Sequence, residues 1–225
     1  MRSRPGAAGH LCEMSAGRPL APALCARLMS STSGSKFVDF RITVCGIAEL
    51  DSHSAVGVTH VLSILDPGTP DPDAFGAFGE HERLDLRFND IIDEIPGQRA
   101  PEPEDVAALL RFGRDIMRES GAHLLVHCHM GISRSTASMA LILAQARPDR
   151  PALDAMAEVR RIRPRIWPNL RLIELGDAAL GRKGDLVAAA IARYRHVLEL
   201  RPEVGEMMTA AGRGREVRAA GSSAP

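Results

Sequence analysis

Two residues able to do phosphate chemistry, Cys128 and Arg134, stand six positions apart among small or uncharged side chains. The apolar run 124–127 before the cysteine is typical of a buried strand, and residues 135–146 favour a helix. A loop between a strand end and a helix start gathers backbone N–H groups around one point, where the helix dipole adds positive potential. Because such a loop stabilises anions, the stretch predicts a phosphate cradle with a sulfur nucleophile at its floor.

Each polar residue of this stretch has a chemical task that suits its type. A helix N-terminus and nearby cations favour the thiolate form of a cysteine, so Cys128 could attack phosphorus and form a phosphocysteine. The planar fork of Arg134 matches two phosphate oxygens, which a lysine could not do. Gly131 permits backbone angles that turn N–H groups inward. The hydroxyl of Ser135 could hydrogen-bond the sulfur when it leaves in a second step.

Other readings of the cysteines and histidines fit less well. His127, Cys128 and His129 do not form a metal site, because neighbouring residues on a strand point to opposite faces. His127 is expected to bond nearby backbone rather than to act as a base. Cys45 is expected in the core rather than in a regulatory disulfide with Cys128. We therefore predict no metal and no cofactor.

The loop residues together resemble the signature of the cysteine-dependent protein tyrosine phosphatase superfamily, and the dual-specificity branch fits best. Residues 163–169 resemble that branch's downstream element, which packs beneath the catalytic loop and makes Asn169 a supporting residue. The resemblance covers about residues 38–180. It implies a protein tyrosine phosphatase-like α/β fold and a substrate-binding loop formed by His129, Met130, Gly131, Ile132, Ser133 and Arg134.

The family also uses an aspartic acid on a loop upstream of the cysteine to protonate the leaving oxygen. Asp90 matches that placement, because it lies just past the predicted strand 82–88. Asp93 is the rival, and Asp85 is less suitable because it falls inside the strand. The same carboxylate would then act as the base on the attacking water.

Hydrophobic patterning predicts the elements that hold these residues. The segments 40–45, 59–65, 82–88 and 124–127 read as strands. Helical segments are expected at 47–54, from 104 to before 121, and at 135–146, 151–162, 169–180 and 185–200. Strands alternating with helices predict an α/β fold with a central, mostly parallel sheet flanked by helices.

The two ends of the chain differ from the rest in composition. Residues 1–35 contain a single acid, Glu13, and short apolar runs, which favours a disordered extension over a transit peptide. Met29 is then a possible natural start. Residues 36–205 are predicted to form the phosphatase domain, and residues 206–225 a flexible tail rich in Gly and Arg.

Composition excludes several classes of function. Lysine plus arginine equals aspartate plus glutamate at 28 each, so overall charge favours neither nucleic acid nor an anionic membrane. The 4% aromatic content argues against a base-stacking platform. No apolar run reaches the roughly 20 residues of a membrane span. Four cysteines without paired spacing favour a reducing, cytoplasmic location.

The expected function is hydrolysis of phosphomonoesters, on a phosphorylated protein or a small phosphate ester. The loop lacks the lysines of phosphoinositide-directed members, which favours protein phosphotyrosine with tolerance of phosphoserine and phosphothreonine. Two alternatives remain: a phosphatase for a non-protein substrate, and a catalytically idle phosphate-binding module. A sulfur- or arsenate-handling enzyme is disfavoured by Ser135 and by the Pro168–Asn169 pair. Four arginines could recognise an acidic group or a second phosphate group, or could form a solvated helix face: Arg160, Arg161, Arg163 and Arg165.

Overall fold

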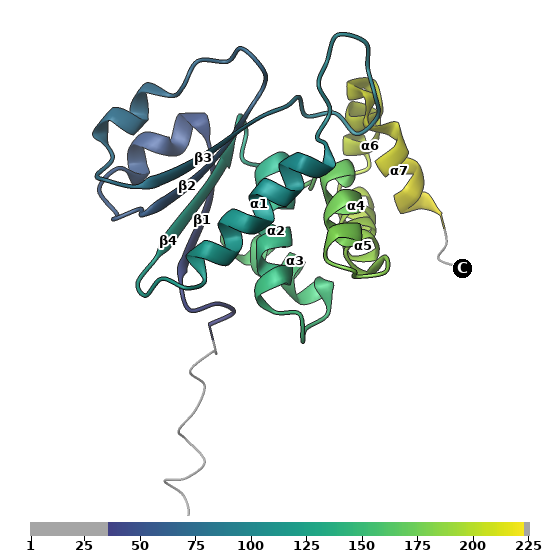
Figure 1. The fold of residues 1–225 in the computed structure, drawn as a ribbon. Helices are drawn as coiled ribbons and strands as arrows, with labels where there is room; N and C mark the ends of the chain where they lie inside the picture. Colours follow the sequence, from purple (N-terminus) through teal and green to yellow (C-terminus); the bar gives the residue numbers. More distant parts are fainter. Residues whose placement is uncertain (1–35, 223–225) are drawn as a thin grey trace, which may run out of the picture. The chain divides into compact units, whose positions relative to one another are not determined.

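The computed structural model describes residues 36–222 of the 225-residue chain, so the predicted N-terminal extension lies outside the described residues. Its sheet has four strands, β1 (Arg41–Gly46), β2 (His60–Leu65), β3 (Glu82–Arg87) and β4 (His123–Cys128). They are ordered β1-β4-β2-β3, and every neighbouring pair is parallel (Figure 1). The predicted α/β fold with a parallel sheet is confirmed, and each strand begins and ends within one or two residues of its predicted bounds.

The helices follow the predicted order as well. They are η1 (Ile47–His53), η2 (Asp73–Ala77), α1 (Pro103–Ile116), α2 (Arg134–Ala146), α3 (Ala152–Ile162), α4 (Leu170–Ala179), α5 (Asp185–Leu200), α6 (Glu203–Met208), η3 (Thr209–Arg213) and α7 (Gly214–Gly221). Both η1 and η2 are 3₁₀ helices, and η2 lies between the predicted strands 59–65 and 82–88, where no helix was predicted. Among the described residues, no helix has the length and apolar character needed to cross a membrane.

The strand β4 is buried on both faces, which explains its apolar run 124–126. Leu124 and Val126 face the larger core, together with α1 to α5. Leu125 points the other way, into a smaller core that contains Cys45 and lies beneath η1 and η2. Burial raises the pKa of the free Cys45 thiol to about 12, so this cysteine stays protonated at neutral pH.

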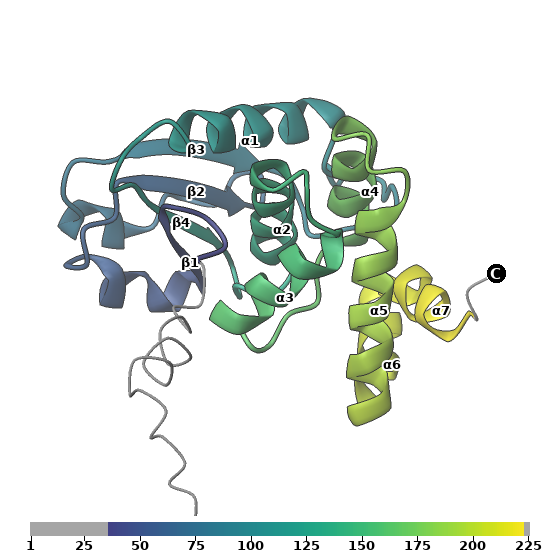
Figure 2. The same cartoon turned by 90° about the horizontal axis from the view of Figure 1, so that it is seen from below.

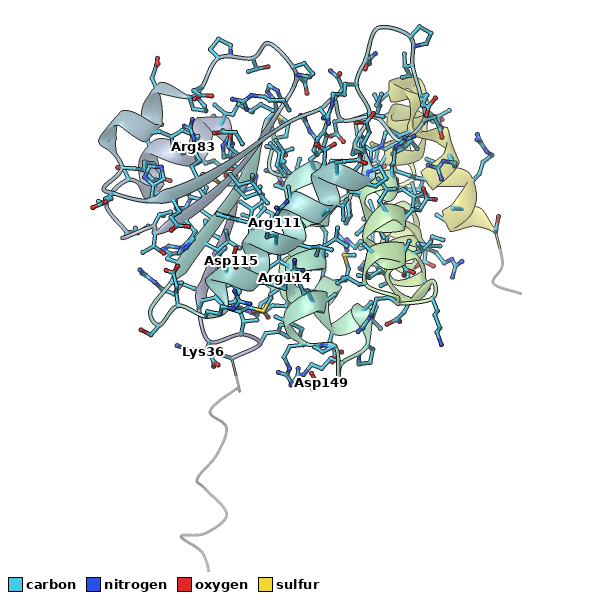
Figure 3. The ribbon with its side chains drawn as sticks, viewed as in Figure 1. Lys36, Arg83, Arg111, Arg114, Asp115 and Asp149 are labelled. Atoms are coloured by element: carbon cyan, nitrogen blue, oxygen red, sulfur yellow. The ribbon has the colours of Figure 1, made fainter. Side chains whose placement is uncertain are left out.

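Helix α1 shows how sequence spacing sets the layers. Apolar residues three and four positions apart form its buried face, and its outer face carries charges. Figure 3 shows Arg111, Arg114 and Asp115 on that outer face, away from the sheet. In Figure 2, α1, α2 and α3 lie on one side of the sheet, and α4 and α5 lie beyond them, farther from the strands.

The C-terminal region differs from the predicted flexible tail. Helices α6 and α7 pack beside α5, and the chain reverses between them at Gly212, whose φ of +78° favours glycine (Figures 1 and 2). Two charged side chains of this segment, Arg213 and Glu216, are 5% and 0% exposed. They tolerate burial because they neutralise each other, so the ordered domain extends past residue 205 to Gly221.

Candidate active site

Cys128 is the last residue of β4 and lies at the edge of the sheet where all four parallel strands end. Ligands of open parallel sheets bind at this carboxyl edge. The thiol is 2% exposed, and its Sγ lies 3.2 Å from the hydroxyl oxygen of Ser135 on the first turn of α2. The structure thus brings together the predicted nucleophile and the residue predicted to assist it.

The loop 129–133 has its carbonyl oxygens turned outward. The His129 carbonyl accepts from Ile47 N at 3.1 Å, and the Ile132 carbonyl accepts from Trp167 N at 2.9 Å. Between them, the guanidinium of Arg163 donates to the carbonyls of Met130 and Gly131, both at 3.0 Å. The segment predicted to pack beneath the loop therefore holds it from outside.

Outward carbonyls place the loop's N–H groups on the inside. In a planar trans peptide, the C=O and the following N–H point in opposite directions. The amides of residues 130–133 therefore face the interior of the loop, toward the end of β4. Four inward amides at a helix N-terminus form an anion-binding concavity.

Gly131 allows the loop to take this shape. Its φ is +66°, and a Cβ there would lie 2.4 Å from the carbonyl carbon of Cys45. Gly46 makes the reciprocal approach, because a Cβ on it would lie 2.8 Å from the His129 carbonyl oxygen. No larger side chain fits at Gly131 unless the loop moves away from β1.

Arg134 is buried and fixed at one end of its guanidinium. Its Nη1 donates to Asp66 Oδ1 at 2.6 Å and to the Phe88 carbonyl at 2.5 Å. Its Nε is buried without a hydrogen-bond partner among the described residues. A buried donor without a partner is costly, so this N–H is a ready donor to a bound anion. Sequence reasoning missed Asp66, which orients Arg134 from the end of β2.

His127 does not make the backbone hydrogen bond expected of it. Neither ring nitrogen has a partner of good geometry in the described part of the chain, and the ring packs 5.5 Å from Phe75 of η2. Burial lowers the pKa of His127 to about 4, against a smaller opposing effect of the Cys128 backbone. The imidazole is neutral at pH 7. It lies on one face of the sheet, whereas Cys128 belongs to the larger core on the other face.

Asp90 reaches the same cavity as Cys128, whereas its rivals do not. Its Oδ1 accepts from Ser133 Oγ at 2.7 Å and from Asn169 Nδ2 at 2.9 Å. Asp93 forms an ion pair with Arg215 at 3.0 Å outside this cavity. Asp85 lies on β3 and accepts from Arg83, as its position inside the strand predicts.

Asn169 joins the segment that carries Asp90 to the catalytic loop. As the N-cap of α4 it accepts from Leu172 N at 3.0 Å, while its Nδ2 also donates to the Ile91 carbonyl at 3.1 Å. Its backbone N–H donates to the Ser133 carbonyl at 3.4 Å. The supporting position predicted for Asn169 matches these contacts.

The C-terminal segment contributes a residue that sequence reasoning missed. Arg213 donates through Nη1 to Asp90 Oδ1 at 3.2 Å and to Ser133 Oγ at 3.1 Å. Its other two nitrogens donate to the buried carboxylate of Glu216 at 2.9 and 2.6 Å. Glu216 also accepts from Trp167 Nε1 at 2.5 Å and from Leu170 N at 3.0 Å. Burial works against the charge of Arg213, but Asp90 and Glu216 raise its pKa above the ordinary value.

A cavity of about 270 Å³ is lined by Asp90, Cys128, Ser133, Arg134 and Arg213. Beyond the polar groups already described, its walls are His129, Met130, Ile132, Trp167, Met208 and Ala211. A larger cavity of about 670 Å³ lies between α3 and α5 and is bordered by Arg160, Arg161 and Arg193, with no cysteine, serine or threonine among its lining residues. The smaller cavity, which contains Cys128, is therefore the candidate active site.

No family model and no curated protein matches this sequence. Solved structures do match, among them Tk-PTP in the active form, with 25% identity, 68% of this chain and 99% of that chain covered, and a TM-score of 0.47. Human DUSP28 has 16% identity, coverage of 63% and 94%, and a TM-score of 0.48. PTPMT1 in complex with PI(5)P has 16% identity, coverage of 67% and 94%, and a TM-score of 0.45. These three structures are protein tyrosine and dual-specificity phosphatases, the superfamily whose signature the loop 128–134 resembles.

Proposed function

We propose that this protein is a cysteine-dependent phosphomonoester hydrolase that acts through a phosphocysteine intermediate. The observation that carries the proposal is the loop 128–134, in which a buried thiol lies at the floor of four inward amides. Beside them is the Nε–H of Arg134, which has no hydrogen-bond partner in the described part of the chain. Such a set of donors binds the three non-bridging oxygens of a phosphoryl group and stabilises charge in the transition state.

In the first step, the Cys128 thiolate attacks phosphorus, and the bond between phosphorus and the ester oxygen breaks. Asp90 protonates the leaving oxygen. Its Oδ1 already accepts three hydrogen bonds, so the transferable proton belongs on Oδ2. Arg213, Ser133 and Asn169 thus fix which oxygen of the carboxyl group serves as the acid.

In the second step, water attacks phosphorus and gives its proton to Asp90, and the phosphorus–sulfur bond breaks. The Ser135 hydroxyl, 3.2 Å from Sγ, donates to the sulfur as negative charge returns to it. Phosphate then leaves, and the thiolate and the protonated Asp90 are restored. Each step draws only on these side chains and water.

The cavity walls favour an aromatic phosphate ester, and protein phosphotyrosine is the proposed substrate class. Met130, Ile132, Trp167, Met208 and Ala211 form an apolar rim that suits a phenyl ring. The loop has no lysine to bind the further phosphates of a phosphoinositide. The free cysteines Cys45 and Cys128 suit a reducing, cytoplasmic location.

The test is hydrolysis of p-nitrophenyl phosphate by the purified full-length chain in the presence of EDTA, followed by addition of vanadate. We expect turnover that EDTA leaves intact, that vanadate blocks, and that Cys128→Ser abolishes. Wild-type protein that binds vanadate without turning over would identify an idle phosphate-binding module. Asp90→Ala should slow turnover far more than the matched variant Asp93→Ala, and the opposite order would assign the acid role to Asp93.

A further inference from the structure

A histidine and two glutamates converge at the edge of the sheet opposite Cys128. His60 opens β2 and pairs in register with Glu82, which opens β3. Glu119 lies in the turn between α1 and β4. One ligand atom from each of these side chains lies within 4.8 Å of the other two. Because the strands are parallel, this cluster is separated from the catalytic edge by the length of the sheet.

His60 is only 2% exposed, and Thr59 and Phe112 fix the orientation of its ring. Its Nδ1 lies 2.8 Å from Thr59 Oγ1, and its ring meets Phe112 of α1 edge-on, with centroids 5.8 Å apart. Thr59 Oγ1 also accepts from His123 N at 2.9 Å and donates to the His123 carbonyl at 3.5 Å. Metal binding at Nε2 requires the tautomer in which Nδ1 donates to Thr59 Oγ1 and Nε2 carries the lone pair.

That lone pair faces two carboxylates. Nε2 lies 3.4 Å from Glu119 Oε1 and 3.8 Å from Glu82 Oε2, yet it makes no hydrogen bond in the described part of the chain. A buried acceptor directed at two anionic acceptors is unfavourable unless a cation lies between them. A neutral imidazole nitrogen with carboxylate oxygens is a common ligand set for zinc.

We propose that His60, Glu82 and Glu119 bind one divalent transition-metal ion, best matched by zinc. Tetrahedral bonds of about 2.0–2.2 Å place ligand atoms about 3.3–3.6 Å apart. The 3.4 Å separation of His60 and Glu119 fits this spacing, and the 70% exposed side chain of Glu82 is free to close the remaining few tenths of an ångström. Thr59 is then the outer partner that orients the imidazole.

The bound ion would join three separate parts of the chain. It would fix the start of β3, which is an edge strand, and the turn after α1 to the start of β2. A ligand that binds only the folded chain raises its stability in proportion to the logarithm of the ligand concentration. The site is therefore structural, and the proposal stands whether or not Cys128 is catalytic.

The test is titration of the full-length chain with zinc by calorimetry, with thermal unfolding measured in parallel. Wild-type protein should bind one ion and gain about 5–10 °C in Tm when free zinc is 100-fold above Kd. Loss of a residue that only hydrogen-bonds a metal ligand typically weakens metal affinity by about 10- to 100-fold. The double variant Glu82→Gln with Glu119→Gln, which removes two ligands, should weaken zinc affinity by more than this. His60 is kept in this variant so that the core is unchanged, and Glu80→Gln, an exposed neighbour outside the cluster, should bind like wild type.

Cobalt distinguishes this site from the free thiols, because a thiolate ligand adds a sulfur-to-metal charge-transfer absorption that imidazole and carboxylate do not. The proposal predicts that wild-type protein with cobalt gives a spectrum without that charge-transfer absorption. The double variant should not give this cobalt spectrum. Three results would overturn it: no saturable binding by wild type, zinc affinity unchanged in the double variant, or binding that disappears only with Cys128→Ser.

Discussion

Arg213 offers the sharpest test of how the C-terminal helices serve the site. Arg213→Ala alone would leave Glu216 buried and unpaired. Breaking a buried ion pair in this way typically costs about 3–5 kcal/mol of stability. We therefore combine Arg213→Met with Glu216→Gln, which removes both charges and keeps side-chain volume. Replacement of a buried ion pair by groups of similar shape is often neutral for folding.

The expected catalytic loss follows from the contacts removed. The double variant loses the charge-assisted hydrogen bond to Asp90 Oδ1 and the bond to Ser133 Oγ. A hydrogen bond to a charged group is worth about 1.5–3 kcal/mol, or about 10- to 150-fold in rate if fully used in the transition state. The part of this loss that acts through Asp90 cannot exceed the loss caused by Asp90→Asn.

The readout is the dependence of kcat on the leaving group. A poorly positioned acid matters most when the leaving oxygen is basic. The kcat for phenyl phosphate should therefore fall far more than the kcat for p-nitrophenyl phosphate. Adding Asp90→Asn to the double variant should cause little loss beyond that of Asp90→Asn alone. Arg218→Ala, on the exposed face of α7, is the control and should leave both substrates unaffected. Equal losses on the two substrates would show that the segment supports only the fold, and full activity would refute the role of Arg213.

Two further predictions concern stability. Since burial lowers the pKa of His127 to about 4, the unfolded chain takes up this proton first as pH falls, and the free energy of unfolding should drop by about 2 kcal/mol between pH 7 and 5. Urea unfolding of His127→Gln should show a correspondingly flatter pH profile, and an equally steep one would contradict the assignment. Gly131→Ala meets both a positive φ and the Cys45 backbone at 2.4 Å, whereas Gly121→Ala meets a positive φ in open space. Gly121→Ala should cost about 1–2 kcal/mol by thermal or urea unfolding and Gly131→Ala clearly more, so equal losses would contradict the packing described for the loop.

Local sequence pattern predicts those parts of the fold whose causes are local. The run 124–126 is apolar because β4 is buried on both faces, and Val106, Leu109 and Ile116 have helical spacing because α1 has one buried face. The resemblance to the phosphatase family predicted Asp90, and the fold explains why this residue lies near Cys128. Asp90 follows a strand, and a parallel sheet brings the ends of its strands to one edge.

The residues that were missed depend on long-range packing. Arg213 and Glu216 occur in a Gly- and Arg-rich segment that is typical of a flexible tail, and each is buried only because the other neutralises it. Asp66 is one of several polar residues in the loop after β2, and its role appears only when Arg134 lies beside it. The pairing of His60 with Glu82 requires the register of two strands, which spacing along one chain does not contain.

The central claim is that the Cys128 sulfur takes up the phosphoryl group. Rapid acid quenching during turnover of p-nitrophenyl phosphate, followed by peptide mass spectrometry, measures this directly. The mechanism predicts one added phosphoryl group on the peptide that contains Cys128, with more of it in Asp90→Ala because removal of the base slows hydrolysis of the intermediate. Turnover by wild type with no phosphorylated Cys128 peptide, or with the phosphoryl group on another residue, would contradict it.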